Sequence, residues 1–274
     1  MAELSAEYGP DLVGDAAKDP RRFPLLVKFL FPHEKLSVQV HPDDESARRL
    51  GQPCGKNECW YVAHAKPGAQ VALGLKSGIT RAQLEQAIHG TGAEELLHWI
   101  DVFPGDMIYV AGGTVHTLGP GAIIVETQQQ CDTTYRLYDY GRSRELHLRE
   151  GLSVMKENPG SGKVAYSEPR AINGTRNRYA RLIASPHFLV ELFELKQPHQ
   201  FRIGAAKTSP QILVAIEGCG VVEANGTEPL TIAKGDAIVV PASITEFCVR
   251  PQWTLEFLKS SVPSGDVPLP VTKL

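Results

Sequence analysis

Three short sequence groups bring together side chains that can bind a metal ion. They are Gln39-x-His41, Gly55-Lys-Asn-Glu58 and Gly113-Thr-Val-His116. Two imidazoles and one carboxylate are a common catalytic zinc set that leaves room for a water or a substrate oxygen, and a Gln oxygen adds a weaker, neutral ligand. In the alternative interpretation, His41 simply follows a strand and His116 lies in a turn. The spacing is unlike that of a zinc finger, so these groups alone leave both interpretations open.

Strands are the elements that we expect to position these groups. Residues 36–41 alternate apolar and polar side chains, so a strand there places Ser37, Gln39 and His41 on one face. Turn residues bound the other short apolar runs of the first half. The predicted strands are two paired runs within 24–41 and further runs at 58–73, near Val102, at 107–111 and at 122–126.

Helices are expected at only a few places. Thr80 is a predicted N-cap of a helix that continues through Ile88, residues 93–99 support another helical turn or two, and residues 145–156 form a closing helix. The acidic run 43–45 resembles a metal cluster, but carboxylates at such a position more often begin a helix by accepting from its first backbone amides.

The second half of the chain repeats the β pattern of the first. The polar stretch 157–178 is rich in Gly, Pro and Asn and predicts a domain boundary. Beyond it, apolar runs recur every 8 to 12 residues or so, which is typical of a β-sandwich or a small barrel. The phrase FPGDMIYVAGG at 103–113 resembles AKGDAIVVPAS at 233–243. This internal repeat indicates two β-barrels of one kind.

Composition excludes several classes of function. The 274 residues carry a net charge of -3 and no long basic run, so neither nucleic acid nor an anionic membrane is an expected partner. No apolar stretch approaches the roughly 20 residues that span a bilayer, and the N-terminus lacks the features of a secretory signal, so we expect a cytoplasmic protein. The five cysteines are scattered, which indicates reduced thiols and not a thiolate zinc site.

One of the three groups resembles a known motif. The phrase Gly105-Asp106-x4-Ala111-x-Gly113-x-x-His116 is similar to the second motif of cupins, with Ala111 where proline is usual. Gln39-x-His41, followed after an insertion by Glu58, is similar to the first cupin motif. The corresponding phrase of the second half ends at Glu246 and not at a histidine, which predicts that the repeated unit carries no metal.

The resemblance then extends to a family, type I phosphomannose isomerase in its shorter prokaryotic form. The chain resembles it in four ordered segments, 36–47, 55–62, 104–142 and 144–147, and most strongly over 24–155. The family interconverts mannose 6-phosphate and fructose 6-phosphate with a bound zinc ion. The resemblance therefore implies a zinc-dependent aldose-ketose isomerase that moves a proton between C1 and C2 through an enediolate.

The resemblance also implies a role for particular residues. One zinc ion per chain would be bound by four ligands, Gln39, His41, Glu58 and His116. The implied catalytic residues are Arg136, Lys56 and Glu126, and those near the substrate phosphate are Lys28, Ser37 and Arg142. The base stays open among three candidates, Glu126, Lys56 and a zinc-bound hydroxide. Arg136 would position the substrate and stabilise charge.

For the whole chain, we expect a mainly β protein of two cupin-like (jelly-roll) β-barrels with a small helical insertion and connecting helices. Residues 1–156 would form the catalytic cupin domain, with the insertion near 80–99, and residues 157–274 a second cupin-like domain without metal ligands. The family's N-terminal segment of early strands is expected to be missing, so residues 1–24 or a second chain would cover an open sheet edge.

Two other functions compete with the isomerase. One is a non-catalytic cupin that binds a sugar phosphate, and the other is an iron or manganese cupin oxidoreductase. Lys56 and Arg136 favour a phosphorylated substrate over the oxidoreductase. The expected partner is a small-molecule sugar phosphate, and a homodimer is one assembly that the sequence allows.

Overall fold

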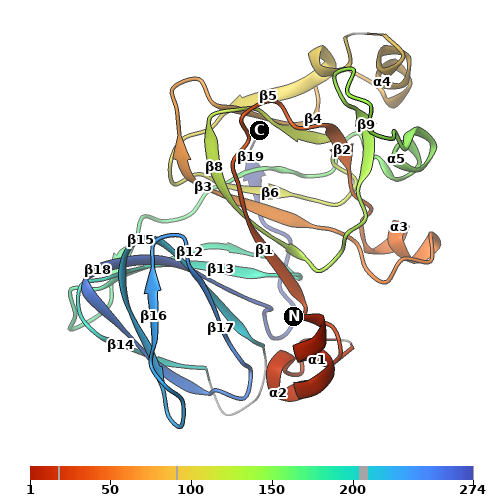
Figure 1. The fold of residues 1–274 in the computed structure, drawn as a ribbon. Coiled ribbons are helices and arrows are strands. Elements are labelled where there is room, and N and C mark those ends of the chain that lie inside the picture. The colour runs from red at the N-terminus through yellow and green to blue at the C-terminus, as the bar shows by residue number, and fades with distance from the viewer. Residues whose placement is uncertain (18, 91, 204–208, 274) are drawn as a thin grey trace. The chain divides into compact units, whose positions relative to one another are not determined.

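The computed structural model describes residues 1–17, 19–90, 92–203 and 209–273 (Figure 1). The protein is mainly β, with 41% strand and 14% helix. It divides into two compact units. We call Leu26–Val164 with Val271–Leu274 the site-bearing unit, and Met1–Leu25 with Ala165–Pro270 the second unit. Within the described ranges, no helix is both long enough and apolar enough to cross a membrane.

The two units differ in their bounds from the domains expected from the sequence. The site-bearing unit extends to Val164 because strand β10 (Gly162–Val164) pairs with β6 (Met107–Val110) of the same unit. Residues 1–25, expected in the catalytic domain, group with the second unit. There α1 (Ala2–Tyr8) is followed by α2 (Pro10–Val13), and the carbonyl of Leu12 accepts from the backbone N–H of Ala242 at 3.0 Å.

Two open antiparallel sheets build the site-bearing unit. The six-stranded sheet has the order β1 (Leu25–Leu30), β8 (Ala122–Gln129), β3 (Glu58–Ala65), β6, β10 and β19 (Thr272–Lys273). The five-stranded sheet has the order β5 (Leu97–Asp101), β4 (Gln70–Leu75), β7 (His116–Leu118), β2 (Val38–Val40) and β9 (Tyr135–Tyr138). The sheets pack face to face (Figure 1). They do not close into one hydrogen-bonded barrel, but the arrangement is consistent with the expected cupin-like β fold.

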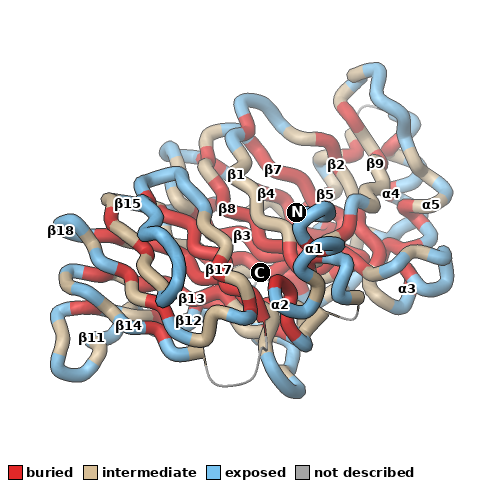
Figure 2. Tube along the Cα trace, turned by 60° about the horizontal axis from the view of Figure 1, so that its bottom comes forward, coloured by how far each residue is buried: buried red, intermediate tan, exposed pale blue. Residues whose placement is uncertain are grey.

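Period-2 alternation decides which side chains enter the space between the sheets. Trp60 and Val62 of β3 pack there with Leu73 and Leu118 from the facing sheet, and these side chains are nearly fully buried. Figure 2 shows that the inner strands are buried along most of their length, namely β3, β4, β6, β7 and β8. Glu58 has the same parity as Trp60 and Val62, so its carboxylate is directed into the same space.

The opposite face of the five-stranded sheet is covered by helices. Val38 and Val40 of β2 pack there against Leu84 of α4 (Arg81–Ile88) and Leu152 of α5 (Leu148–Val154). Because Gln39 alternates with these two valines, it faces inward. The apolar face of β2 thus packs against the helices, and its opposite face carries Gln39 toward the site.

The helices begin close to where the sequence predicts. Thr80 caps α4 through a capping box with Gln83, and Asp43 caps α3 (Asp44–Arg49) by accepting from the backbone N–H of Ser46 at 2.7 Å. The acidic run 43–45 is therefore a helix start. The prediction for 93–99 is correct only for the 3-10 helix η1 (Ala93–Leu96), because Leu97 already begins β5.

The second unit is built on one eight-stranded sheet with a phenylalanine-rich core. Its main path is β11 (Arg170–Ala171), β12 (Arg178–Ala184), β13 (Leu189–Leu195), β18 (Glu246–Ser261), β15 (Gln211–Ala224) and β16 (Leu230–Ala233). Two further strands pair with this path, β14 (His199–Arg202) with β18 and β17 (Ala237–Val240) with β15.

The repeated phrase forms the same turn in both units. The Asp106 carboxylate accepts from the backbone N–H of Phe103 at 2.8 Å, and Asp236 accepts from that of Ala233 at 2.9 Å. The glycine before each aspartate has a φ of 91°, a conformation that side chains other than glycine rarely adopt. β6 follows the first turn and β17 follows the second, so the sequence repeat corresponds to a structural repeat.

Gly112→Ala is expected to lower the free energy of unfolding by about 1–3 kcal/mol. A Cβ at Gly112 would lie 2.5 Å from the Cα of Asp43, a backbone atom that cannot move without shifting the cap of α3. Urea unfolding measures the change. Gly90→Ala is the matched control, because there the nearest atom lies at an ordinary 3.6 Å. Equal stability of both variants would contradict the prediction.

Candidate functional site

Three side chains from neighbouring elements meet between the sheets of the site-bearing unit. His41 follows β2, Glu58 begins β3 and His116 begins β7. All three are buried, and their ligand atoms lie within 4.8 Å of one another. Gln39 is the register partner of His116, and its amide nitrogen lies 3.3 Å from Nε2 of that ring. Two sheets thus bring residues 39, 41, 58 and 116 to one point.

Backbone carbonyls fix the orientation of both imidazoles. Nδ1 of His41 lies 3.0 Å from the carbonyl oxygen of Thr133, and Nδ1 of His116 lies 2.9 Å from that of Thr114. A carbonyl only accepts, so each Nδ1 carries the proton and donates it. Each Nε2 therefore presents a lone pair. These Nε2 atoms lie 3.6 and 3.4 Å from the carboxylate oxygens of Glu58, His41 facing Oε2 and His116 facing Oε1.

The donor set fits a divalent metal ion. Nε2 of His41 and both oxygens of Glu58 are buried without a hydrogen-bond partner in the protein. Buried lone pairs without a partner are costly, and a cation removes that cost. Four tetrahedral ligands at about 2.0–2.1 Å from zinc lie about 3.4 Å apart. The observed separations between the imidazoles and the carboxylate match this value.

The pKa values of His41, His116 and Glu58 show how the site is charged when no cation is bound. Burial lowers the pKa of His41 well below its usual value and that of His116 to about 4, so both rings are neutral at pH 7. Burial, together with the negative charge of Glu126, raises the pKa of Glu58 to about 8. The positive charges of Lys56 and Lys28 oppose this shift only in part, and the neutral histidines add no positive charge, whereas a bound divalent ion would.

Two lysines and a second carboxylate lie beside the cluster. Nζ of Lys56 is 3.8 Å from Oε2 of Glu58, and the Lys56 side chain is buried. Glu126 of β8 is paired in register with Trp60. Its Oε1 accepts from Nζ of Lys28 at 2.9 Å, and the same Nζ donates to Oε1 of Gln128 at 2.6 Å. Acidic and basic groups therefore alternate along the inner face of the six-stranded sheet.

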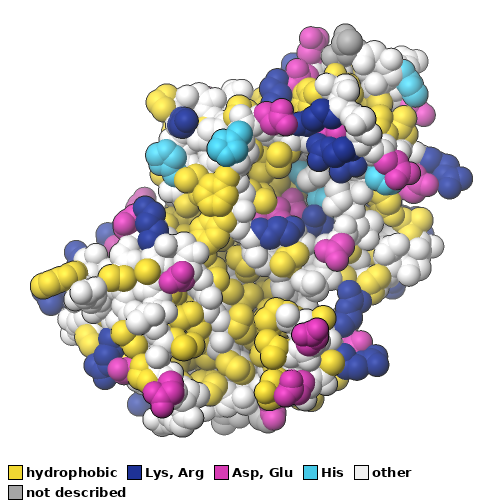
Figure 3. Space-filling view, viewed as in Figure 1, with side chains coloured by type: hydrophobic (Ala, Val, Ile, Leu, Met, Phe, Trp, Pro, Cys, Tyr) yellow, Lys and Arg dark blue, Asp and Glu magenta, His cyan; other side chains and the backbone are white. Residues whose placement is uncertain are grey.

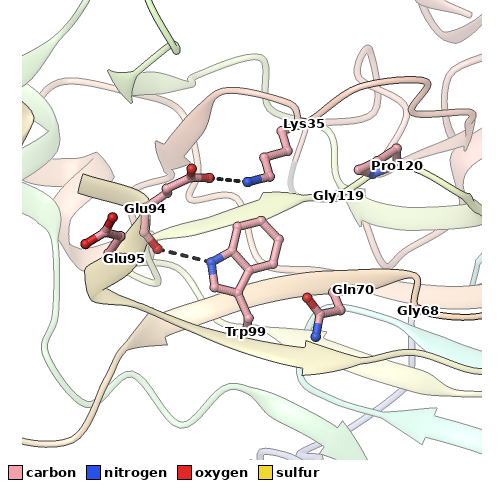
Figure 4. Close-up of a pocket in the computed structure, with 8 residues that line it drawn as sticks. All are labelled: Lys35, Gly68, Gln70, Glu94, Glu95, Trp99, Gly119 and Pro120. Atoms are coloured by element: carbon pink, nitrogen blue, oxygen red, sulfur yellow. Dashed lines mark hydrogen bonds and ion pairs between the residues drawn. The ribbon is translucent and has the colours of Figure 1, made fainter. Parts of the chain in front are cut away.

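Basic, acidic and histidine side chains gather in a hollow on this face of the site-bearing unit, between β1 and β9 in the view of Figure 3. A different cavity of about 430 Å³ is lined by Lys35, Gln70, Glu94 and Trp99 among others and by none of the residues discussed so far (Figure 4). Lys35 and Glu94 form an ion pair of 2.5 Å, and Trp99 donates to the Glu94 carbonyl. Lys35, Glu94 and Trp99 are thus paired with one another, so the buried cluster is the better candidate for chemistry.

Comparison with known proteins gives the family. No family model matches the sequence. The chain is 35% identical over 251 residues to the mannose-6-phosphate isomerase of Streptococcus mutans serotype c, covering 89% of this chain and 75% of that protein. The chain belongs to the mannose-6-phosphate isomerase family. Mannose-6-phosphate isomerase ManA of Bacillus subtilis is 36% identical, with 88% of this chain and 76% of that protein covered.

Solved structures of mannose-6-phosphate isomerases share the fold. That of the Bacillus subtilis enzyme superposes with a TM-score of 0.80 at 30% identity, covering 94% of this chain and 81% of that chain. A mutant of the phosphomannose isomerase of Salmonella typhimurium gives a TM-score of 0.73 at 14% identity, covering 94% and 84%. At that identity the second likeness is one of fold alone.

The structure places the residues implied by the mannose-6-phosphate isomerase family in two groups. Residues 39, 41, 56, 58 and 116 are linked by the contacts described above, and Lys28 and Glu126 form an ion pair whose charges act on Glu58. Arg136 is the register partner of Gln39, but its guanidinium donates to the Glu145 carbonyl at 2.8 Å. Arg142 donates to Asp139 and to Glu34. Each arginine is thus bound by partners of its own, Nε of Arg136 is buried without a hydrogen-bond partner, and Ser37 is buried just before β2.

Sequence reasoning missed the groups that orient the ligands. The carbonyls of Thr114 and Thr133 hold the imidazoles, and Gln128 holds Lys28. Every residue has a carbonyl, so no residue type could have identified the first two. Gln128 had a usable signal, since it lies two residues beyond Glu126 on the same strand and therefore on the same face. Trp60 contacts His116 edge to face, at 5.6 Å between ring centroids, as part of the core.

The repeated turn identifies the positions of the second unit that correspond to the site. The backbone N–H of Val62 donates to the carbonyl of the turn's aspartate at 2.9 Å, and Ala215 makes the same bond to the second turn at 3.0 Å. Glu58 lies four residues before Val62 on β3, and Gln211 lies four residues before Ala215 on β15. Gln211 therefore corresponds to Glu58. The carboxylate ligand of the site-bearing unit is thus replaced by an amide.

The rest of the corresponding cluster is also different. Lys259 takes the position of Glu126, and its Nζ lies 2.5 Å from the Glu191 carboxylate and donates to Oε1 of Gln211 at 3.0 Å. The position of His116 in the repeated phrase is taken by Glu246. Lys259 and Glu191 neutralise one another, and Glu246 is paired with Arg202 at 3.3 Å. In the described part of the chain, His41, Glu58 and His116 are the one set of His, Cys, Asp or Glu side chains grouped closely enough to hold a metal.

Proposed function

We propose that this chain interconverts mannose 6-phosphate and fructose 6-phosphate and binds one zinc ion through Gln39, His41, Glu58 and His116. The observation that carries the proposal is the convergence of buried lone pairs on Nε2 of His41 and both carboxylate oxygens of Glu58, atoms without a hydrogen-bond partner in the protein. Membership of the mannose-6-phosphate isomerase family supports the substrate. The same arguments favour residues 26–164 as the catalytic unit and the second unit as one without metal ligands.

The ligand residues determine the charge at the centre. Glu58 is the one anionic ligand, so a divalent ion keeps a net charge near +1. When bound, the zinc ion would polarise the substrate carbonyl and stabilise negative charge on the two enediolate oxygens. Thr114 and Thr133 keep the imidazoles oriented, and the amide of Gln39 can present its oxygen after a flip of its side chain.

Proton transfer between C1 and C2 requires a base beside the cluster, and Glu126 is our first choice. Lys28 binds Oε1 of Glu126, so Oε2 is the oxygen that takes the proton from one carbon and returns it to the other. Lys56 is the second choice. Its ammonium lies against the Glu58 carboxylate, an arrangement that suits holding charge better than accepting a proton.

The remaining residues are proposed to bind the substrate. Arg136 would stabilise negative charge on the sugar oxygens, and Lys28, Ser37 and Arg142 would bind the phosphate. Asp139 accepts from Arg142 and from Arg144, which holds the Arg142 guanidinium in place. Lys28 can bind phosphate only by loosening its bond to Glu126 or Gln128. The cytoplasmic location and the homodimer expected from the sequence stay predictions.

Metal removal tests the proposal. Purified full-length protein should contain about one zinc per chain by elemental analysis and convert mannose 6-phosphate in a coupled assay. Incubation with a chelator should abolish turnover and lower the melting temperature, and zinc should restore both, since a ligand at 100 times its Kd stabilises the folded state by about 2.7 kcal/mol. Folded, zinc-loaded protein that binds mannose 6-phosphate without converting it would contradict the isomerase and support a sugar-phosphate-binding cupin.

A further inference from the structure

Two cysteines lie side by side next to the candidate metal centre. Cys54 is in the connection from α3 to β3, and Cys131 follows β8, 77 residues further along the chain. The Cys54 thiol donates to the carbonyl of Gln130, and the Cys131 thiol donates to the carbonyl of Cys54, both at 3.4 Å. Each sulfur therefore contacts the backbone beside the other cysteine, and neither is in a disulfide.

The loops that carry this cysteine pair are held together by side-chain amides. Oε1 of Gln129 accepts from the backbone N–H and the side-chain amide of Asn57, at 2.9 and 2.7 Å. Its Nε2 donates to Asp44, which also accepts from the backbone N–H of Gly55 at 2.7 Å. A disulfide requires two Cα atoms within about 7 Å. These bonds hold the two loops beside each other, and each thiol already reaches the backbone beside the other cysteine.

The surroundings of Cys131 favour its thiolate. Hydrogen bonding with the Cys54 side chain, further hydrogen bonds with Thr133 and the positive charge of Lys56 lower the pKa of Cys131 to about 6, against the opposing effect of burial. Cys59 provides the contrast, because burial raises the pKa of its thiol well above the usual value. Cys54 is half-buried and Cys131 is buried, so a small oxidant would have to reach the pair from the Cys54 side.

We propose that Cys54 and Cys131 are a modification site for peroxide that closes to an intrachain disulfide beside the metal centre. The Cys131 sulfur attacks one oxygen of hydrogen peroxide, the O–O bond breaks, and a sulfenic acid and hydroxide form. The Cys54 sulfur then attacks this sulfenic sulfur, the S–S bond forms, the S–O bond breaks, and water leaves with the Cys54 proton. The two thiols are oxidised by two electrons and the peroxide is reduced. A dithiol reductant reverses the change.

Closure of the disulfide acts on groups that orient the site. The carbonyl of Cys131 accepts from Gln128 at 3.0 Å, and Gln128 holds Lys28. Two residues beyond Cys131, the Thr133 carbonyl holds His41. Disturbing such outer groups costs about 10–100-fold in metal affinity or activity. The disulfide itself does not depend on the proposed isomerase, but this loss of activity does.

Peptide mapping tests the modification directly. The full-length reduced protein is treated with hydrogen peroxide at pH 7, blocked with N-ethylmaleimide, digested without reductant and analysed by mass spectrometry. We expect a linked peptide pair that contains Cys54 and Cys131, formed at monomer mobility on a non-reducing gel and released by dithiothreitol. Turnover of mannose 6-phosphate, measured in parallel, should fall about 10-fold or more and recover with the reductant.

Three variants separate this pair from general oxidation. Cys54→Ser and Cys131→Ser should each prevent the linked peptide and the recovery by reductant. Cys248→Ser, which removes a half-buried cysteine of the second unit, should behave as the unchanged protein. Separate sulfinic or sulfonic acids at both positions, or links between two chains, would overturn the proposal. If the linked peptide forms in a protein without isomerase activity, the modification stands and the proposed function fails.

Discussion

His116→Ala is expected to lower kcat/KM for mannose 6-phosphate by about 10³-fold or more and to remove most of the bound metal. A metal Lewis acid contributes several kcal/mol of charge stabilisation, and each 1.36 kcal/mol corresponds to about a factor of ten in rate. The variant deletes one of two neutral donors whose lone pairs face the Glu58 carboxylate, His116 from 3.4 Å. Coupled assays and elemental analysis of the same preparation measure both effects.

The fold should survive this substitution. Without a cation, Glu58 has a pKa raised to about 8 by its burial, so at pH 7 it can take up a proton and avoid an unpaired buried charge. His64→Ala is the matched control, since His64 lies on the same strand β3 but is exposed. It should keep both metal and activity. A His116→Ala protein that retains zinc and turnover would remove residue 116 from the ligand set.

The inner faces of β2 and β3 were the most predictable part of the site. Alternation in 36–41 placed Gln39 between two buried valines, and this pattern alone decides which way it points. The convergence of β2, β3 and β7 could not be read from alternation, because it depends on pairings between residues far apart in the chain, such as that of Gln39 with His116. Their residue types suggested a common metal site, and the resemblance to a family supported that grouping.

Long charged side chains were harder to predict than short ligands. Arg142 and Arg136 have several rotatable bonds, and nearby acceptors compete for each guanidinium. Asp139 and Glu34 bind the first, and the Glu145 carbonyl binds the second. The grouping of residues 1–25 with the second unit could not be predicted for a related reason. Their sequence specifies α1 and α2 locally, whereas the backbone bond from Ala242 to Leu12 is a long-range contact.

Glu126→Gln is expected to lower kcat by about 10²–10⁴-fold while zinc content stays unchanged. The amide keeps the size of the side chain and can still accept from Lys28, but it cannot take a proton from carbon at neutral pH. The decisive readout is incorporation of solvent deuterium at the carbon-bound position of the sugar, which should be lost with turnover. If Glu126 only maintained the local structure, its replacement would weaken substrate binding as well, and deuterium incorporation would not be lost on its own.

Two further variants decide between Glu126 and its neighbours. Lys28→Met removes the same 2.9 Å ion pair but leaves the carboxylate, so it should raise KM more than it lowers kcat and should preserve deuterium incorporation. Lys56→Met removes the ammonium that lies 3.8 Å from Glu58 and should lower kcat without abolishing exchange. The reverse outcome, with exchange lost in Lys56→Met and kept in Glu126→Gln, would assign the base to Lys56. The Lys56 amine would then have to move away from the Glu58 carboxylate to reach the sugar.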